Sequence, residues 1–580
     1  MKKVFGVEKF KGLLLAGSFT VLANYFVRLS DSVVAGNMLG PDALAGINLV
    51  SPILAVTSFF SGLVSTGMAT NYSLAMGRCE KLRARQFFMQ ALWMVLVFGG
   101  IFAALIGFGR GAFADYMGAS ETISAFSLDY MSWAWVAVVP ECLLGLLIML
   151  GYADGDAKLC TLAYAVNFVV NLGASIVAIR CGMGAAGCSF ATVMADIAGI
   201  AVLSAHFFRK SNTFAPTLHF SFGDSWRIVA ASFGDAAAFL CDGLLFFFLN
   251  KYVIMNFGSD VLPVVGVAVA LWGFLEFFNG IGVAIQPIVT VYYGEGNMKS
   301  VRTVMHAAMK VAVIEGLAFM VFFGLFPDLV SAMVGIREPE LVRQSAIAIR
   351  CMCGGFIALA FAGLFNSYYM FVEKAFLAGA VTFLCYLVMP VSCVAAGSLF
   401  GIEGVWAGMG AGPFAGLLMT SFVIIPTAGW KAFPLLLPRD RDEKVHVFNL
   451  RLVDEEIVET SRKVGELPGV PMRAALMTEE VFMAVKDRNR GKKLLGEVTA
   501  DLNDGVKLVL RDDGEIFDIT DADAEISSLR TFLVASIMET QKGRLNLVTT
   551  GFNRNVFEFK ALPITKNPKY PIDRRSKFMR

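Results

Sequence analysis

Long apolar runs separated by short polar segments fill the first three quarters of the chain. Each run is long enough to cross a hydrocarbon core of roughly 30 Å as an α-helix. Two of them, 44–76 and 260–292, exceed a single span, which indicates tilt or a kink. The pattern predicts twelve membrane-spanning helices, near residues 12–38, 44–76, 86–108, 126–152, 158–180, 185–208, 226–256, 260–292, 303–325, 343–372, 375–398 and 403–430.

The pattern changes after Pro438, where apolar and polar residues mix as they do in soluble domains. Alternation over a few residues predicts strands, and a 3.6-residue period predicts helices. The expected strands are 445–452, 494–502, 506–511, 545–550 and 556–559, and the expected helices are 470–485 and 526–538. Residues 439–580 are therefore predicted to form a separate soluble α+β domain, which is large enough to fold alone.

The apolar region carries an internal duplication. Three glycine-containing segments recur 217 or 218 residues later, as the pairs Gly40 and Gly258, Gly77 and Gly294, and Gly184 and Gly401. A near-constant offset at three places is the mark of a repeat. We therefore expect an all-α polytopic membrane protein with two six-helix bundles, residues 1–215 and 216–438, and a site between them.

Composition agrees with a membrane protein and excludes several function classes. The 580 residues are 56% hydrophobic and 17% charged, against roughly 25% charged in an average soluble protein. No basic cluster with interleaved aromatic residues suggests a nucleic-acid partner. The ten cysteines are scattered and have no metal-ligand spacing, so neither a metal site nor a cofactor is expected.

The distribution of lysine and arginine indicates on which side of the membrane each loop lies. They collect at the N-terminus, near 78–85, 209–227 and 299–302, and after residue 430, and they are missing near 39–43, 257–260 and 399–402. The positive-inside rule then puts both termini in the cytoplasm. Lys2 and Lys3 precede a run that is long enough to span and has no small-residue cleavage site, so it is not a cleavable signal. We expect a multi-pass protein of the cell's inner (plasma) membrane, surrounded by lipid.

Several motifs resemble those of the multidrug and toxic-compound extrusion (MATE) transporters of the MOP superfamily. They are Asn24-Tyr25 through Asp31, the segment Leu39 to Ala45, Gly77 with the basic residues that follow it, Asn171 with Gly182 to Thr192, Gln286-Pro287, and Gly401 to Trp406. The resemblance covers roughly residues 10–430. It implies a secondary active multidrug exporter, not an enzyme, which moves small organic and often cationic substrates by antiport with Na⁺ or H⁺.

The resemblance also suggests cation-coupling residues. The family's acid in the first helix matches Asp31, and a carboxylate deep in an apolar helix is costly unless it has a role or a partner. The family often has Asn followed four residues later by Asp, but Asn171 is followed by Ser175, whose hydroxyl could ligate Na⁺ but could not carry a proton. Asp196 could compensate or could be a packing residue, and Asp242 lies near a helix-seven acid of sodium-coupled members.

A second set of residues is expected to line a substrate cavity, namely Arg28, Glu276, Asn279 and Tyr368. Arg28 lies three residues before Asp31, so the two could equally form a structural ion pair. Glu276 and Asn279 share a helix face. Tyr368 could stack on a cationic substrate, although an aromatic residue in such a helix often only packs.

The C-terminal domain resembles the histidine-kinase-like ATPase fold of anti-sigma factors, through Glu480 on a helix and Asp512-Asp513-Gly514 after a strand. The position four residues after Glu480 is Ala484, which supplies no oxygen to Mg²⁺. We therefore expect a degenerate domain that senses or docks, which leaves room for a cytoplasmic protein partner. Adenine binding through Asp512 or Asp513 remains an alternative.

Two other functions fit the same helices. A flippase for lipid-linked oligosaccharides would need several cationic side chains around a pyrophosphate, and the apolar helices contain few and scattered arginines. A membrane-anchored signalling protein would use the C-terminal domain as its output. Neither alternative names a substrate.

Overall fold

The computed structural model describes residues 4–39, 43, 46–47, 50–78, 80–117, 121–208, 220–257, 261–274, 276–334, 338–428, 444–503, 505–515, 545–547 and 552–559. The chain divides into two compact units. The larger one, which we call the membrane unit, contains residues 6–439 and 548–551. The smaller one, the C-terminal unit, contains residues 1–5, 440–547 and 552–580.

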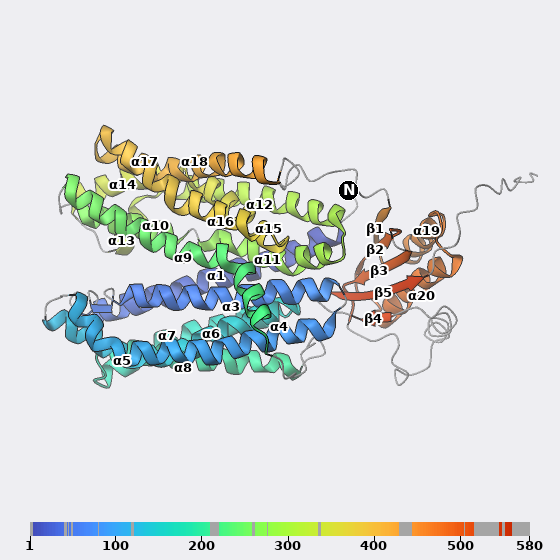
Figure 1. Ribbon diagram of the computed structural model, residues 1–580, viewed down its shortest axis with the longest axis horizontal. Helices are drawn as coiled ribbons and strands as arrows, with labels where there is room; N and C mark the ends of the chain where they lie inside the picture. Colours follow the sequence, from blue (N-terminus) through green and yellow to red (C-terminus); the bar gives the residue numbers. More distant parts are fainter. Residues whose placement is uncertain are drawn as a thin grey trace, which may run out of the picture. The chain divides into compact units, whose positions relative to one another are not determined.

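Helices make up the described part of the membrane unit (Figure 1). We call residues 5–208 the N-terminal lobe and residues 222–428 the C-terminal lobe. The N-terminal lobe contains α1 (Phe5–Met38), α3 (Ser51–Gly77), α4 (Lys81–Met94), η1 (Val95–Gly99), α5 (Gly100–Met117), α6 (Glu121–Ala153), α7 (Ala157–Arg180), α8 (Ala186–Ser204) and η2 (Ala205–Phe208). The C-terminal lobe contains α9 (Phe222–Phe257), α10 (Leu262–Gly273), α11 (Glu276–Gly294), α12 (Met298–Leu325), α13 (Asp328–Val334), α14 (Pro339–Cys353), α15 (Phe356–Phe371), α16 (Ala375–Phe383), η4 (Leu384–Val388), α17 (Met389–Gly397), η5 (Ser398–Phe400) and α18 (Ile402–Ala428).

Nine helices in the described part of the chain are long and apolar enough to cross a membrane. Two bent pairs, with angles of 46° and 48°, raise the number to eleven at most. The protein is thus a mostly helical, multi-pass membrane protein, while the expected number of twelve helices stays a prediction. The long run 260–292 is divided into α10 and α11, as its length indicated.

Two of the three duplicated glycine pairs occupy matching places in the two lobes, and the third pair, Gly40 and Gly258, lies outside the described residues. Gly77 is the last residue of α3 and Gly294 is the last residue of α11. The two helix ends meet, because a methyl group on Gly77 would lie 3.1 Å from the Cα atom of Gly294. Gly184 and Gly401 precede α8 and α18 with positive φ angles of 57° and 83°, a conformation that glycine adopts at no steric cost.

Each lobe has its own apolar core. In the N-terminal lobe, Met68 and Tyr72 of α3 pack with Leu146 of α6. In the C-terminal lobe, Ile285 of α11 and Tyr369 of α15 belong to the larger core. Prolines within the helices, such as Pro140 and Pro287, are tolerated because neighbouring helices satisfy the freed backbone groups.

The C-terminal unit contains a five-stranded sheet in the order β1-β2-β3-β5-β4, with all neighbours antiparallel. Its elements are β1 (Val445–Arg451), α19 (Asp454–Gly465), α20 (Met472–Arg488), β2 (Leu495–Asp501), β3 (Val506–Asp512), β4 (Leu545–Leu547) and β5 (Asn553–Phe559). Phe482 of α20 packs on Val498 and Leu510 of the sheet. The small sheet agrees with an α+β domain, but α19 was not predicted, and the expected helix 526–538 lies outside the described residues.

Candidate functional site

Asp31 lies at the centre of a polar cluster inside the N-terminal lobe. Its side chain is only 7% exposed. The hydroxyl groups of Tyr130 on α6 and Thr192 on α8 both donate to Asp31 Oδ2, each at 3.3 Å. Within the described residues, Asp31 Oδ1 has no hydrogen-bond partner. The carboxylate is therefore held by neutral groups and keeps one oxygen available.

Helices α7 and α8 are joined by two polar contacts, one helical turn apart. Asn171 donates through Nδ2 to Thr192 Oγ1 at 3.1 Å. Asn167 donates through Nδ2 to Asp196 Oδ1 at 2.9 Å. Because residues four apart share a helix face, the two contacts form successive rungs of one ladder. We call these four residues the polar ladder.

The cluster connects to α1 through Ser30, whose hydroxyl donates to Asn171 Oδ1 at 2.9 Å. Ser175, one turn beyond Asn171 on α7, is fully buried. The structure thus brings Asp31, Asn171 and Asp196 into one lobe, with Ser175 beside them. Sequence reasoning did not select Ser30, Tyr130, Asn167 or Thr192 as site residues, although the four-residue spacing of polar side chains on α7 and α8 is a usable signal.

The other predicted residues of the membrane unit whose side chains the structure describes belong to the C-terminal lobe. Asp242 on α9 accepts a hydrogen bond from Trp272 Nε1 at 3.0 Å. Asn279 on α11 is exposed. Tyr368 on α15 is 3% exposed and packs edge to face against Tyr369 at 5.3 Å, and its contact with a substrate stays a prediction. The side chains of Arg28 and Glu276 lie outside the described part of the structure.

The two lobes close on each other at the end that carries the basic segments, which we call the basic end. Arg83 of α4 holds Asp224, in the first turn of α9, by two contacts of 2.8 and 2.5 Å. Gln90 of α4 donates to Ser225 Oγ and accepts from the Ser221 backbone N–H, both at 2.7 Å. The first turns of α9 therefore belong to one lobe by sequence but are held by the other.

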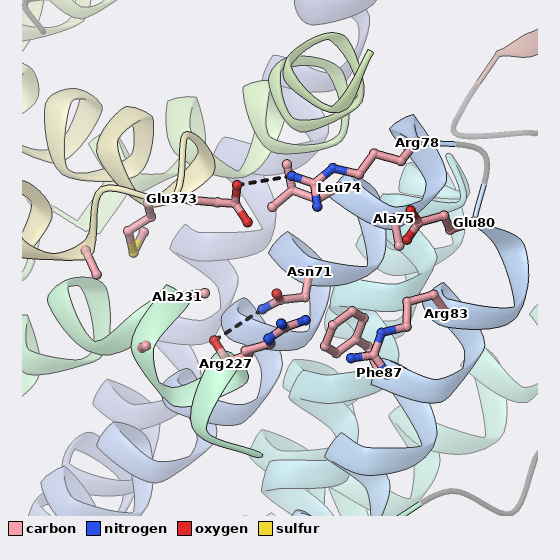
Figure 2. A pocket seen from close by; sticks show the side chains of 13 residues that line it. Asn71, Leu74, Ala75, Arg78, Glu80, Arg83, Phe87, Arg227, Ala231 and Glu373 are labelled. Atoms are coloured by element: carbon pink, nitrogen blue, oxygen red, sulfur yellow. Dashed lines mark hydrogen bonds and ion pairs between the residues drawn. The ribbon is translucent and has the colours of Figure 1, made fainter. Parts of the chain in front are cut away.

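A small cavity lies at this closure (Figure 2). It has a volume of about 310 Å³ and is lined by residues of both lobes. Arg78 of the N-terminal lobe reaches Glu373 of the C-terminal lobe across its mouth at 3.2 Å. Asn71 donates to the Arg227 backbone oxygen at 3.3 Å. Any motion that separates the lobes at this end must open the cavity and break these contacts.

A charge-paired contact between Arg83 and Asp224 predicts measurable coupling across the lobes. The Asp224 side chain is 5% exposed and the Arg83 side chain 29%, so the pair is only partly screened by solvent. In a double-mutant cycle of Arg83→Gln and Asp224→Asn, we expect a coupling of about 1–3 kcal/mol in thermal unfolding measurements. The double variant should be no less stable than the worse single variant. Strictly additive effects would mean that the pair contributes nothing.

A second buried ionic group lies where α6, α7 and η2 meet. His206 Nδ1 lies 2.5 Å from Asp156 Oδ2, and its Nε2 lies 3.1 Å from Asp154 Oδ2. Tyr72 donates to the other oxygen of Asp154 at 2.8 Å. Ionised carboxylates only accept, so a ring that bonds both must carry two N–H groups and a positive charge.

Replacing His206 with leucine would leave Asp154 and Asp156 without this cation. We expect a loss of about 3–5 kcal/mol in the free energy of unfolding, the cost of breaking a buried ion pair. Thermal unfolding in detergent measures it. Ser204→Leu, at an exposed position two residues earlier, is the control. An unchanged unfolding midpoint for the His206 variant would show that these ionic contacts contribute nothing to stability.

Asp512 and Asp513, in the acidic turn at the end of β3, accept hydrogen bonds from other residues of the C-terminal unit. Asp512 Oδ1 accepts from Asn553 Nδ2 at 2.7 Å and from the Gly514 N–H at 2.9 Å. Asp513 Oδ1 accepts from the Leu495 N–H at 2.7 Å. Glu480 on α20 is half-buried. The two aspartates thus hold the end of β3 in place, and a nucleotide site at these residues stays a prediction.

Comparisons with known proteins agree on one family. The MatE family model matches residues 17–177 and 237–395. The probable multidrug resistance protein NorM of Rhizobium meliloti (strain 1021) is 22% identical over 344 residues, covering 56% of this chain and 72% of that protein. An outward-facing structure of a multidrug resistance MATE family transporter of the MOP superfamily has a TM-score of 0.66 at 19% identity, covering 73% of this chain and 99% of that one. A MOP superfamily transporter from Pyrococcus furiosus, described as having a binding pocket of reverse polarity, has a TM-score of 0.65 with the same identity and coverage.

Proposed function

The chain belongs to the MatE family of membrane transporters, and we propose that it is a secondary active exporter of organic, often cationic, compounds. Proteins of this family are transporters and not enzymes. The proposal goes further, to a cation antiporter in which Na⁺ or H⁺ drives export. NorM and one of the solved MATE structures carry multidrug resistance in their descriptions, which supports this substrate class here.

One observation carries the coupling part of the proposal, the buried Asp31 carboxylate, one oxygen of which has no hydrogen-bond partner among the described residues. An intramembrane acid whose described hydrogen-bond partners are all neutral is expensive, so it has reason to bind a cation. Hydroxyl groups of Ser30, Tyr130 and Thr192 surround it, together with the Asn171 amide. Such a set suits either a hard cation such as Na⁺ or a proton.

Coupling then requires only that the cation binds the two conformations with different affinity. Asp31 lies on α1, and its partners lie on α6 and α8, so a bound cation changes contacts among three helices of the N-terminal lobe. We propose Asn171 and Ser175 as its neighbours in coupling, and Asp242 as a second candidate in the C-terminal lobe. The residues predicted to line a substrate cavity, Arg28, Glu276, Asn279 and Tyr368, remain candidates for substrate contact.

The positive-inside rule places the basic end in the cytoplasm, together with both termini, in the inner membrane. In this reading the contacts of Arg83, Gln90 and Arg78 close the cytoplasmic side. The conformation described here would then correspond to one from which substrate leaves to the outside. The return step would break the same contacts.

Reconstitution of the full-length protein in liposomes tests the proposal. Efflux of a fluorescent organic cation is followed with a sodium gradient and a pH gradient imposed separately. Efflux driven by one gradient would support antiport and would identify the coupling ion. If neither gradient drives efflux while the protein is folded, the antiport proposal is wrong. Flipping of a fluorescent lipid-linked oligosaccharide, measured in the same vesicles, would then favour the flippase alternative.

A further inference from the structure

The N-terminal lobe contains a second buried carboxylate, Asp196 on α8, which forms one rung of the polar ladder with Asn167. Its side chain is 4% exposed. Asp196 Oδ1 accepts one hydrogen bond, from Asn167 Nδ2 at 2.9 Å. Its Oδ2 is also buried and has no hydrogen-bond partner among the described residues. This carboxylate is thus less satisfied than Asp31, which accepts from two hydroxyl groups.

Among the described residues, the groups that interact with Asp196 lie on α6, α7 and α1, and none of them is basic. Glu141 and Cys142 of α6 and Asp31 of α1 interact with it electrostatically, and α7 contributes the neutral Asn167. Two carboxylates near each other in apolar surroundings resist full ionisation, and one proton between them relieves the repulsion. The arrangement therefore favours a bound proton.

A sodium ion fits this position poorly. A hard cation of this kind requires several oxygen ligands. Asn167 turns its amide nitrogen toward Asp196, so the side chain that hydrogen-bonds this carboxylate among the described residues offers it a donor and not a ligand oxygen. A proton needs only one oxygen, and Asp196 Oδ2 offers it. The Asp31 position differs, because three hydroxyl groups lie around it.

We propose that Asp196 is a second proton-binding group, separate from the cation site at Asp31 and lying one rung of the ladder toward the basic end. This assignment deepens the proposed function and rests on it for its role in coupling. The family often has an aspartate at the position of Ser175 on α7, and Asp196 on α8 would take over the role of that carboxylate. The site takes a proton and not Na⁺.

Infrared difference spectroscopy of the purified full-length protein tests proton binding without any transport assay. Spectra are recorded from alkaline to acidic pH, and a buried protonated carboxyl group gives a carbonyl band that ionised groups lack. The wild type should show a band that disappears in Asp196→Asn. The same band should persist in Asp31→Asn and in the control Asp115→Asn, which changes an exposed residue of α5. Adding sodium chloride should leave the Asp196 band unchanged.

Three results would contradict the assignment. A spectrum of Asp196→Asn identical to wild type at every pH would show that Asp196 does not change its protonation. Suppression of the Asp196 band by sodium would show that the site takes the metal ion. Asp196→Glu, which restores a carboxyl group, should restore a carbonyl band, and its absence in a folded protein would also count against the proposal. Because these results do not depend on efflux, a protein that fails to transport can still confirm or refute them.

Discussion

Replacing Asp31 with asparagine is expected to abolish gradient-driven efflux while the protein remains folded. The variant keeps the size and one oxygen of the side chain but removes the charge that holds a cation. Coupling free energies are typically 1–3 kcal/mol, a 5–150-fold effect, and we expect a loss near the upper end, about 100-fold. Efflux from liposomes under the driving gradient, at equal protein incorporation, measures it.

The control for Asp31→Asn is Asp115→Asn, which makes the same chemical change at an exposed position of the same lobe. It should transport at the wild-type rate. Substrate binding without a gradient should survive in the Asp31 variant, because the substitution targets the cation. Wild-type efflux in Asp31→Asn would exclude this residue as the coupling site and would move attention to Asp196 and Asp242.

Replacing Gly67 with valine is expected to prevent the lobes from closing at the basic end. Gly67 on α3 packs directly against the backbone of α9, where even a single added carbon would lie 2.1 Å from the Ile228 oxygen. That oxygen belongs to a helix backbone and cannot rotate away. Overpacking of this kind costs typically 1–3 kcal/mol or more, so we expect efflux to fall by about 100-fold, with the protein trapped open at the basic end.

Cross-linking of cysteines introduced at Arg83 and Asp224 reports closure when the bifunctional thiol reagent is about as long as the ion pair it replaces, because the two side chains are in contact. The cross-link should form readily in the Gly67 background and at least about tenfold more slowly with Gly67→Val. Gly62→Ala is the matched control on the same helix, where an added methyl group would have ordinary contacts at 3.6 Å. Equal cross-linking in both backgrounds, with efflux intact, would show that the lobes still close and that the packing accommodates the valine.

Several helices were predictable because apolar length is a local property of the sequence. The run 158–180 became α7 and the run 226–256 became α9 with small extensions. Bends and irregular turns were not predicted. The π-helical segments at Val95–Gly99 and Leu384–Val388 depend on how neighbouring helices accommodate an extra residue, and no local pattern encodes that.

The site was predictable only in part. Asp31 and Asn171 could be selected by their resemblance to a family motif, and Asp196 by its charge in an apolar run. Their partners could not, because the Thr192 contact to Asp31 joins positions 161 residues apart. A helical sequence shows which residues share a face, but it does not show which face meets which helix.

By itself, the sequence determined the class of the protein: a duplicated helical membrane transporter with a separate C-terminal domain. Apolar run length, loop charge and the repeat offset suffice for that, since each is read along the chain. Tertiary structure alone decided which oxygens surround Asp31, that Tyr368 is buried, and that the first turns of α9 are held by α4. These depend on helix crossing and rotation, which arise from the packing of many distant side chains at once.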